Sequence, residues 1–263
     1  MYETIELEIR GQVATVSLNR PSVRNAFNAE MIRDLTETFT HLGTRDDIRV
    51  VVLQGHGPSF SAGADISWMR SSLEFTEEQN EADARRMSDM FAAIDEAPQV
   101  VIGRVHGAAL GGGMGLLAVC DIVVAAEGTT FGFTEAKLGI IPAVISRFVL
   151  SRIGVRWARA LYLTAERFGP DVARQIGLVH WVVPADDLDQ CVHAKIREVL
   201  TSGPEATRVA KQLIAEASGM EPGGLRDYTA RAIATVRTSP EGQEGLRAFL
   251  DKRRPNWLDE DTD

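Results

Sequence analysis

The chain has 263 residues, of which 44% are hydrophobic and 25% charged, the composition of an ordinary globular protein with a substantial core. Its formal net charge of -9 disfavours broad contact with nucleic acid or an anionic membrane. Every apolar stretch is interrupted by charge, glycine or proline before it reaches membrane-spanning length. The two cysteines, Cys120 and Cys191, have no partner spacing typical of a disulfide framework or a metal site. We therefore expect a soluble, cytoplasmic protein with free thiols.

The first half of the chain predicts strands that alternate with helices. Two alternating segments around a glycine predict a hairpin, residues 5–9 and 13–18. Continuously apolar runs are typical of strands covered on both faces, and they occur at residues 50–53 and 100–102. Further short strands are expected at residues 122–125 and 130–133. Two helices are expected between these strands, one capped by Asn28 and running to about His41, the other running from Thr76 to about Ala97.

The second half predicts helices with one strand among them. From Ala143 onward helical periodicity dominates, and a strand is expected at residues 178–183. Further helices are predicted at residues 186–200, 204–217, 224–238 and 241–253. The order indicates an α/β core over residues 1–200, followed by a helical region over residues 201–263.

The most informative segment is a run of three glycines, Gly111, Gly112 and Gly113, between an apolar strand and an apolar helix. Glycine permits backbone conformations that a side chain would block, and it lets a ligand approach main-chain amides. The first amides of a helix lack intrahelical partners. Such a turn suits a developing negative charge on a substrate oxygen.

Two further segments complete a constellation. Residues 58–66 form a loop of small residues after a buried strand, and residues 131–142 place one carboxylate, Glu135, in an apolar, glycine-punctuated stretch. With residues 19–27 and 249–253, these segments resemble, in order and over almost the whole chain, the crotonase (enoyl-CoA hydratase/isomerase) superfamily. The resemblance implies an α/β fold, a crotonase-type ββα spiral core with a C-terminal helical trimerisation region.

The resemblance also implies a ligand and an assembly. The ligand is an acyl-CoA thioester, so coenzyme A belongs to the substrate and no separate cofactor or metal is expected. The assembly is a homotrimer or a hexamer formed as a dimer of trimers, in which residues 201–263 join the subunits and complete the CoA site.

By position, the resemblance implies that the backbone amides of Ala64 and Gly112 bind the thioester oxygen and that Glu135 is the acid/base group. Moving a proton beside a thioester carbonyl puts negative charge on its oxygen, which two preset amides stabilise. A carboxylate among apolar neighbours can have a raised pKa and can exchange a proton with carbon or water. The implied substrate and CoA contacts are Arg24, Ala26, Phe27, Ala62, Asp65, Ile66, Gly111, Gly115, Phe249 and Lys252. Asp65 also has the place of a helix cap, and Phe249 and Lys252 often act from a neighbouring subunit.

Gly115 departs from the pattern of typical hydratases, which have a second glutamate twenty positions before the first. A single glutamate resembles the enoyl-CoA isomerases instead. Residues 115–116, 141–146 and 241–250, however, are similar to bacterial methylglutaconyl-CoA hydratases of leucine and branched-acid catabolism. On that resemblance we expect the space at Gly115 to admit a water or part of a branched acyl chain, with Arg147 meeting a distal carboxylate.

The sequence therefore predicts an enoyl-CoA hydratase that adds water reversibly to a 2-enoyl-CoA, branched or methylglutaconyl-like. Two alternatives stay open. One is a Δ3-Δ2-enoyl-CoA isomerase that uses Glu135 alone, which Gly115 favours. The other is an acyl-CoA-binding protein without catalysis, which the presence of Glu135 disfavours.

Overall fold

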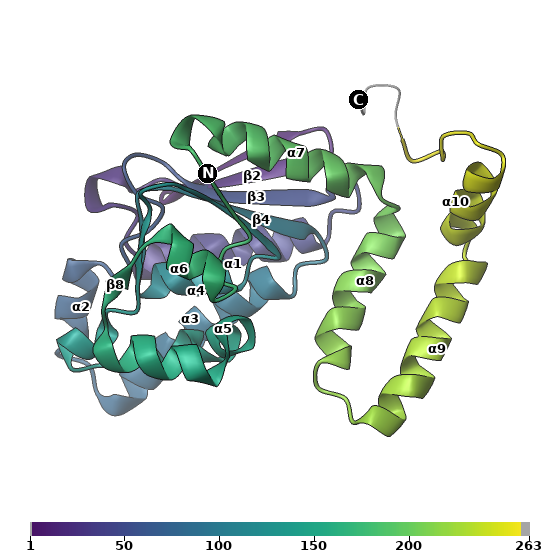
Figure 1. Cartoon of the computed structure of the whole chain (residues 1–263). Coiled ribbons are helices and arrows are strands. Elements are labelled where there is room, and N and C mark those ends of the chain that lie inside the picture. The colour runs from purple at the N-terminus through teal and green to yellow at the C-terminus, as the bar shows by residue number, and fades with distance from the viewer. Residues whose placement is uncertain (1, 259–263) are drawn as a thin grey trace.

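The computed structural model describes residues 2–258 and consists of a layered body and a helical arm (Figure 1). The larger sheet has the strand order β1-β2-β3-β4-β6-β9. Its strands are β1 (Ile5–Arg10), β2 (Val13–Leu18), β3 (Val50–Gly55), β4 (Val100–Val105), β6 (Ile122–Ala126) and β9 (Trp181–Val183). β1 and β2 form the predicted antiparallel hairpin, and all the other pairs are parallel.

A smaller sheet and the helices surround this core. The smaller sheet contains β5 (Ala108–Leu110), β7 (Thr130–Gly132) and β8 (Arg167–Phe168). The helices of the body are α1 (Ala29–Gly43), α2 (Ile66–Ser72), α3 (Glu77–Asp95), α4 (Gly112–Ala118), α5 (Ala143–Thr164), α6 (Pro170–Gln175) and α7 (Leu188–Thr201). Those of the arm are α8 (Pro204–Ala217), α9 (Pro222–Thr238) and α10 (Pro240–Leu250). Short 3-10 turns lie at Pro21–Val23, Glu135–Leu138 and Ala185–Asp187.

The starts of α1 and α3 confirm the predicted caps. Asn28 accepts a hydrogen bond from the Met31 amide at 2.9 Å. Thr76 and Gln79 form a reciprocal capping box at the start of α3, which satisfies two amides that the helix itself leaves free. α1 and α3 therefore begin where these polar side chains stand.

Both faces of the larger sheet are covered, as the continuous apolar strands predict. One face packs against α1, α3, α4 and α5 in a single large core. The other face carries a smaller cluster in which Val50 and Val52 of β3 lie with Leu188 and Val192 of α7. Strand side chains alternate between the two faces, so each run of valines contributes to both clusters.

Several predicted boundaries were wrong. The strand expected at residues 178–183 begins only at Trp181, because the amides of Leu178 and Val179 donate to the Ala173 carbonyl instead of joining a ladder. The last helix ends at Leu250 and not at residue 253, and Lys252 has a φ of 56°, which a helix does not allow. The sequence did not predict α2, α6, β5 or β8.

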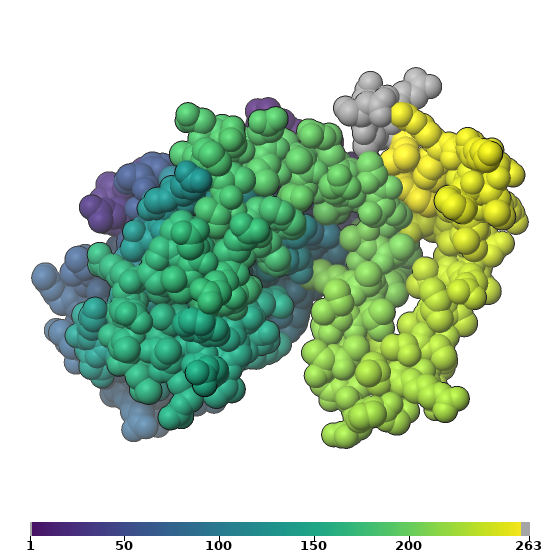
Figure 2. Space-filling view, viewed as in Figure 1, coloured from purple at the N-terminus to yellow at the C-terminus, as the bar shows by residue number. Residues whose placement is uncertain are grey.

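The arm stands apart from the body in Figures 1 and 2, joined to it through α7. None of the residues described in α8 or α9 is buried, and large apolar side chains are exposed along the arm: Ile214, Ile233, Leu246, Phe249 and Leu250. An ion pair of 2.7 Å between Lys211 of α8 and Asp121 ties the arm to the body. Across residues 2–258, no helix combines the length and the apolar character needed to cross a membrane.

Candidate active site

Two glycine-containing turns are held side by side by main-chain hydrogen bonds. The Ser61 amide donates to the Ala108 carbonyl at 3.0 Å, and the Leu110 amide donates to the Ser61 carbonyl at 3.0 Å. Gly63 has a φ of 91°, and a Cβ there would lie 2.9 Å from the Leu110 carbonyl oxygen. Only glycine fits both the conformation and the close approach at this position.

The Ala64 amide is turned away from the neighbouring chain. The Phe27 amide donates to the Gly63 carbonyl at 2.7 Å, and the Asp65 amide donates to the Phe27 carbonyl at 2.8 Å. Successive amides of an extended chain point in opposite directions, so the Ala64 N–H points to the other side. Within residues 2–258 it has no hydrogen-bond acceptor.

The Gly112 amide is free for a different reason. Gly112 is the first residue of α4, so its N–H precedes the intrahelical ladder. The Gly111 amide before it donates to the Gly132 carbonyl at 2.9 Å, while Gly112 itself finds no acceptor in the described part of the chain. Ala64 and Gly112 line one cavity.

Glu135 begins the 3-10 turn after β7 and lines the same cavity. Its Oε2 is buried and has no hydrogen-bond partner among the described residues. Its Oε1 would lie 3.4 Å from a Cβ placed on Gly111, so the carboxyl adjoins the glycine turn. Burial raises the pKa of the Glu135 carboxyl. A proton can thus reside on this group nearer to neutral pH than on an exposed glutamate.

The cavity has a volume of about 240 Å³ and is mostly apolar. Helices α2 and α3 form one wall, and Glu135 with the segment that enters α5 forms the other. The lining residues are Ala64, Trp68, Met69, Ser72, Asn80, Asp83, Ala84, Met87, Gly112, Glu135, Ile140, Ile141, Pro142, Ala143, Val144 and Ile145. The arrangement can hold a carbonyl oxygen at two amides while a carboxyl group acts on the adjacent carbons.

Asp65 stabilises the loop that carries Ala64. Its Oδ1 accepts from the Ser67 amide at 2.7 Å and so caps α2, and its Oδ2 pairs with Arg20 Nη2 at 2.8 Å. Burial alone would raise the pKa of Asp65, but Arg20 and the capped amides outweigh it and hold the pKa below its usual value. The structure therefore gives this predicted ligand contact the role of a cap, and both oxygens are in use.

Other predicted ligand contacts are distributed around the two turns. The Arg24 carbonyl accepts from the Ala62 amide at 2.9 Å, which places both residues beside the loop. Ile66 is 73% exposed at the start of α2. Ala26 is buried, and Phe27 is fully buried with its ring under Gly112. The Phe27 ring fills the core, and a path for CoA along Arg24, Ala26 and Phe27 stays a prediction.

Phe249 and Lys252 are not brought to the cavity within one chain. Phe249 is 79% exposed on α10, and Lys252 follows just after that helix. Figure 1 shows α10 at the far end of the arm, away from α2 and α3. A contribution of these two residues from a neighbouring subunit stays a prediction.

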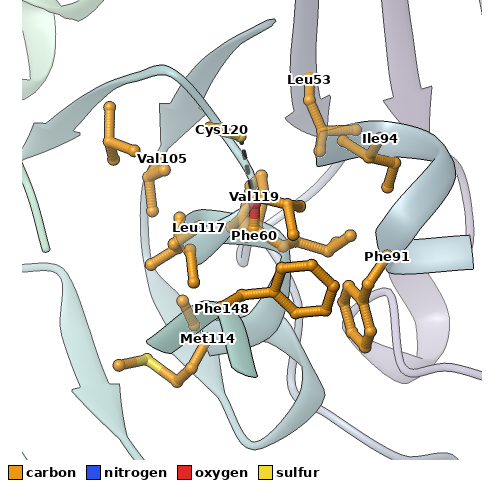
Figure 3. Close-up of a cluster of buried hydrophobic side chains, with 14 of the residues drawn as sticks. Leu53, Phe60, Phe91, Ile94, Val105, Met114, Leu117, Val119, Cys120 and Phe148 are labelled. Carbon is orange, nitrogen blue, oxygen red and sulfur yellow. Dashed lines mark hydrogen bonds between the residues drawn. The ribbon is translucent and has the colours of Figure 1, made fainter. Parts of the chain in front are cut away.

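The expected space at Gly115 does not exist. A Cβ on Gly115 would meet Ile145 Cγ2 and would lie 2.7 Å from Phe91 Cζ. Phe91 also packs against Phe148 with a centroid distance of 6.0 Å, and Figure 3 shows the two rings together in the core. Side chains from α3 and α5 therefore occupy the volume that we expected to admit water or acyl chain. Gly115 is a packing residue of α4.

The expectation for Arg147 was also wrong. Its guanidinium is exposed, lies 3.5 Å from Glu96 and stands over the Phe148 ring at 5.1 Å. Arg147 is not among the residues that line the cavity. A carboxylate on the acyl chain would not meet it there.

Replacing Gly115 by alanine is expected to lower the free energy of unfolding by about 1–3 kcal/mol, because the new methyl group overpacks against Phe91 and Ile145. Urea unfolding of the variant measures this loss. The matched control is Gly224→Ala in α9, where a Cβ meets no atom within 4 Å and helix propensity predicts a small gain. If Gly115→Ala were as stable as the wild type, the conclusion that Phe91 and Ile145 fill the volume beside Gly115 would be wrong.

Cys120 supports the same picture of a packed interior. It is buried, its Sγ donates to the Leu116 carbonyl at 3.1 Å (Figure 3), and burial raises the pKa of the thiol. A thiol held protonated in this way is a poor nucleophile. The structure thus agrees with the prediction that Cys120 is a core residue.

Comparisons with known proteins indicate the family of the chain. The chain matches the enoyl-CoA hydratase/isomerase family over residues 8–260. It is 30% identical to the short-chain-enoyl-CoA hydratase of Clostridium acetobutylicum, over 94% of this chain and 95% of that protein. Among solved structures, an enoyl-CoA hydratase from Shewanella pealeana is similar with a TM-score of 0.93 and 37% identity, over 97% of this chain and 96% of that one. Pseudomonas aeruginosa AtuE is similar with a TM-score of 0.94 and 36% identity, over 98% and 100%.

The chain therefore belongs to the enoyl-CoA hydratase/isomerase family, and it is an enzyme of the crotonase superfamily. The predicted fold class is confirmed: a mixed α/β core of that superfamily followed by C-terminal helices.

Proposed function

We propose that the protein is an enoyl-CoA hydratase with Glu135 as its single acid/base group. The observation that carries the proposal is the half-buried Glu135 carboxyl, whose buried Oε2 has no hydrogen-bond partner among the described residues, in the cavity that the free amides of Ala64 and Gly112 also line. Two amides aimed at one oxygen stabilise the enolate of a thioester, and one such donor typically contributes on the order of 10²–10³ in rate.

A single carboxylate, Glu135, can carry out both proton transfers that hydration requires. Glu135 takes a proton from water as the water oxygen bonds to C3 of the 2-enoyl thioester, and the electron pair of the double bond moves onto the thioester oxygen. The enolate is held by the amides of Ala64 and Gly112. Glu135 then returns the same proton to C2, which gives the 3-hydroxyacyl-CoA. Both additions take place on the face where Glu135 lies.

The substrate within this class was expected to be branched and methylglutaconyl-like. The lining residues support an acyl chain without charge better than one with a carboxylate. Two carboxylates, Glu135 and Asp83, belong to the lining, and no lysine or arginine does within residues 2–258. We therefore propose a neutral 2-enoyl chain, with methylglutaconyl-CoA as the comparison substrate.

The second candidate function is a Δ3-Δ2-enoyl-CoA isomerase. It is favoured by Gly115, where typical hydratases have a second glutamate and where Phe91 and Ile145 leave no room for one. Glu135 would then carry one proton between C2 and C4 with no water added. A binding protein without catalysis would give the buried carboxyl no task.

We further propose that the arm completes the enzyme by association with other copies of the chain, in a trimer or a pair of trimers. The exposed apolar side chains of α8, α9 and α10 support such an interface. Phe249 and Lys252 would then reach the CoA of a neighbouring subunit, with Lys252 as a point charge for phosphate.

The experiment that tests the function is product analysis by mass. The protein is incubated separately with crotonyl-CoA, 3-methylglutaconyl-CoA and a 3-enoyl-CoA. Gain of one water supports the hydratase, and migration of the double bond at constant mass supports the isomerase. Tight binding of all three thioesters with no conversion would contradict both reactions.

A further inference from the structure

One wall of the cavity carries polar side chains that the proposed reaction does not use. Asn80, Asp83 and Met87 recur along α3 at helical spacing and all line the cavity. Met87 marks the end near the reacting carbons, because its Cε lies 3.3 Å from the position of a Cβ on Gly112. Asp83 lies four residues before Met87, a separation of about 6 Å along the helix. The wall thus becomes polar where the distal part of an acyl chain would lie.

Asp83 lines the cavity, and one of its two carboxylate oxygens accepts no hydrogen bond from the described part of the protein. The residue is only 8% exposed. Its Oδ1 accepts from Arg86 Nη2 at 2.7 Å, whereas its Oδ2 accepts no hydrogen bond from any residue between 2 and 258. Arg86 does not line the cavity. Asp83 Oδ2 does not belong to the fully buried side-chain atoms that lack a partner, so it is accessible as a hydrogen-bond acceptor to water or to a ligand hydroxyl.

The neighbouring polar side chains do not supply that donor. Asn80 Nδ2 donates to the Phe75 and Thr76 carbonyls at 3.4 and 3.2 Å. Ser72 Oγ donates to the Met69 carbonyl at 2.8 Å. Both side chains are engaged with their own backbone, so the donor for Asp83 Oδ2 is water or a group of the molecule that fills the cavity.

We propose that Asp83 determines acyl-chain specificity by accepting a hydrogen bond from a hydroxyl group on the distal part of the chain. This inference rests on the proposed function, because it takes the cavity to hold the acyl group. Asp83 is paired with Arg86 from outside the lining, and no cation of the lining is left to pair with a carboxylate at the end of an acyl chain. The favoured substrate class is a hydroxylated 2-enoyl-CoA, ahead of the plain alkyl chain and of the dicarboxylic one.

Binding measurements test the inference without requiring turnover. Calorimetry compares hexanoyl-CoA, 6-hydroxyhexanoyl-CoA and glutaryl-CoA on the wild type and on Asp83→Leu and Asp83→Asn. A hydrogen bond to a charged acceptor predicts that the wild type binds the hydroxylated ester about tenfold more tightly than the plain one. Asp83→Leu is expected to abolish this ratio. Asp83→Asn is expected to weaken the ratio and to bind glutaryl-CoA several-fold better, because it removes the like charge.

The matched control is Asp89→Asn, an exposed carboxylate on α3 that does not line the cavity, and it should leave all three affinities as in the wild type. Ratios of affinities cancel any general loss of active protein. An unchanged ratio in Asp83→Leu, or a wild type that prefers hexanoyl-CoA, overturns the role of Asp83. Turnover of crotonyl-CoA is followed in parallel. If the wild type shows the binding preference but hydrates nothing, the proposed reaction fails while the assignment of Asp83 stands.

Discussion

Glu135→Gln is expected to lower turnover of the enoyl-CoA substrate by about 10²–10⁴-fold, the range typical for loss of a general acid/base group. Glutamine has nearly the same shape, so the two turns and the cavity should persist and the thioester should still bind. Steady-state kinetics and calorimetry measure the two effects separately. The matched control is Glu127→Gln, an exposed glutamate outside the cavity, which should leave the rate unchanged. Wild-type turnover in Glu135→Gln would remove the acid/base assignment.

The burial of the Glu135 carboxyl can be tested independently of catalysis, by measuring the folding stability of Glu135→Gln as a function of pH. Because the folded-state pKa of Glu135 is raised above that of the unfolded chain, ionisation disfavours the folded state. The wild type therefore keeps its full stability below the ordinary pKa of glutamate, and it loses this contribution as pH rises toward the raised folded-state pKa. Glu135→Gln does not lose stability in this way, because glutamine does not ionise. Its stability relative to the wild type should increase from acid to neutral pH, and a constant difference at every pH would contradict a desolvated carboxyl.

The turns of the site could be predicted because their signals are local. Glycine is favoured where the backbone has a positive φ and another segment of the chain comes close, as at Gly63 and Gly111. A carboxylate between an apolar strand and an apolar helix is likewise visible in the sequence, so Glu135 was found without coordinates. These residues identify the family and the chemistry together.

The contents of the cavity could not be predicted in the same way. The absence of a side chain at Gly115 suggested free volume, but the volume is filled by Phe91 of α3 and Ile145 of α5. Which side chains lean into a space depends on how distant helices pack, and no local pattern encodes it. The polar wall was missed for the same reason. In the sequence, Asp83 is one of many charged residues on a polar helix, and only the packing of α3 shows that it faces the cavity.

Adding a methyl group at Gly63, in Gly63→Ala, is expected to reduce both folding stability and catalytic rate more than any other single methyl group added in the site. It forces a φ of 91° on a residue with a Cβ and drives that Cβ to within 2.9 Å of the Leu110 carbonyl oxygen. Incompatible glycine replacements of this kind cost on the order of 1–3 kcal/mol of folding free energy. Relief of the contact separates the two turns, and a displacement of about 1 Å at a catalytic group can cost roughly 10²-fold in rate. Urea unfolding and kcat/KM measure the two losses.

A control at Gly128 separates the effect of the collision with Leu110 from the effect of backbone strain. Gly128 has a φ of 77°, lies between β6 and β7, and offers a new Cβ no atom within 4 Å. Gly128→Ala therefore carries the strain of a positive φ without any collision, and it should lose stability while keeping kcat/KM. If Gly63→Ala loses only as much as Gly128→Ala and still turns over substrate at the wild-type rate, the contact between the turns does not position the Ala64 amide. If Gly63→Ala loses far more kcat/KM than Gly128→Ala at a similar loss of stability, the spacing of the two turns is what holds the two amides on one oxygen.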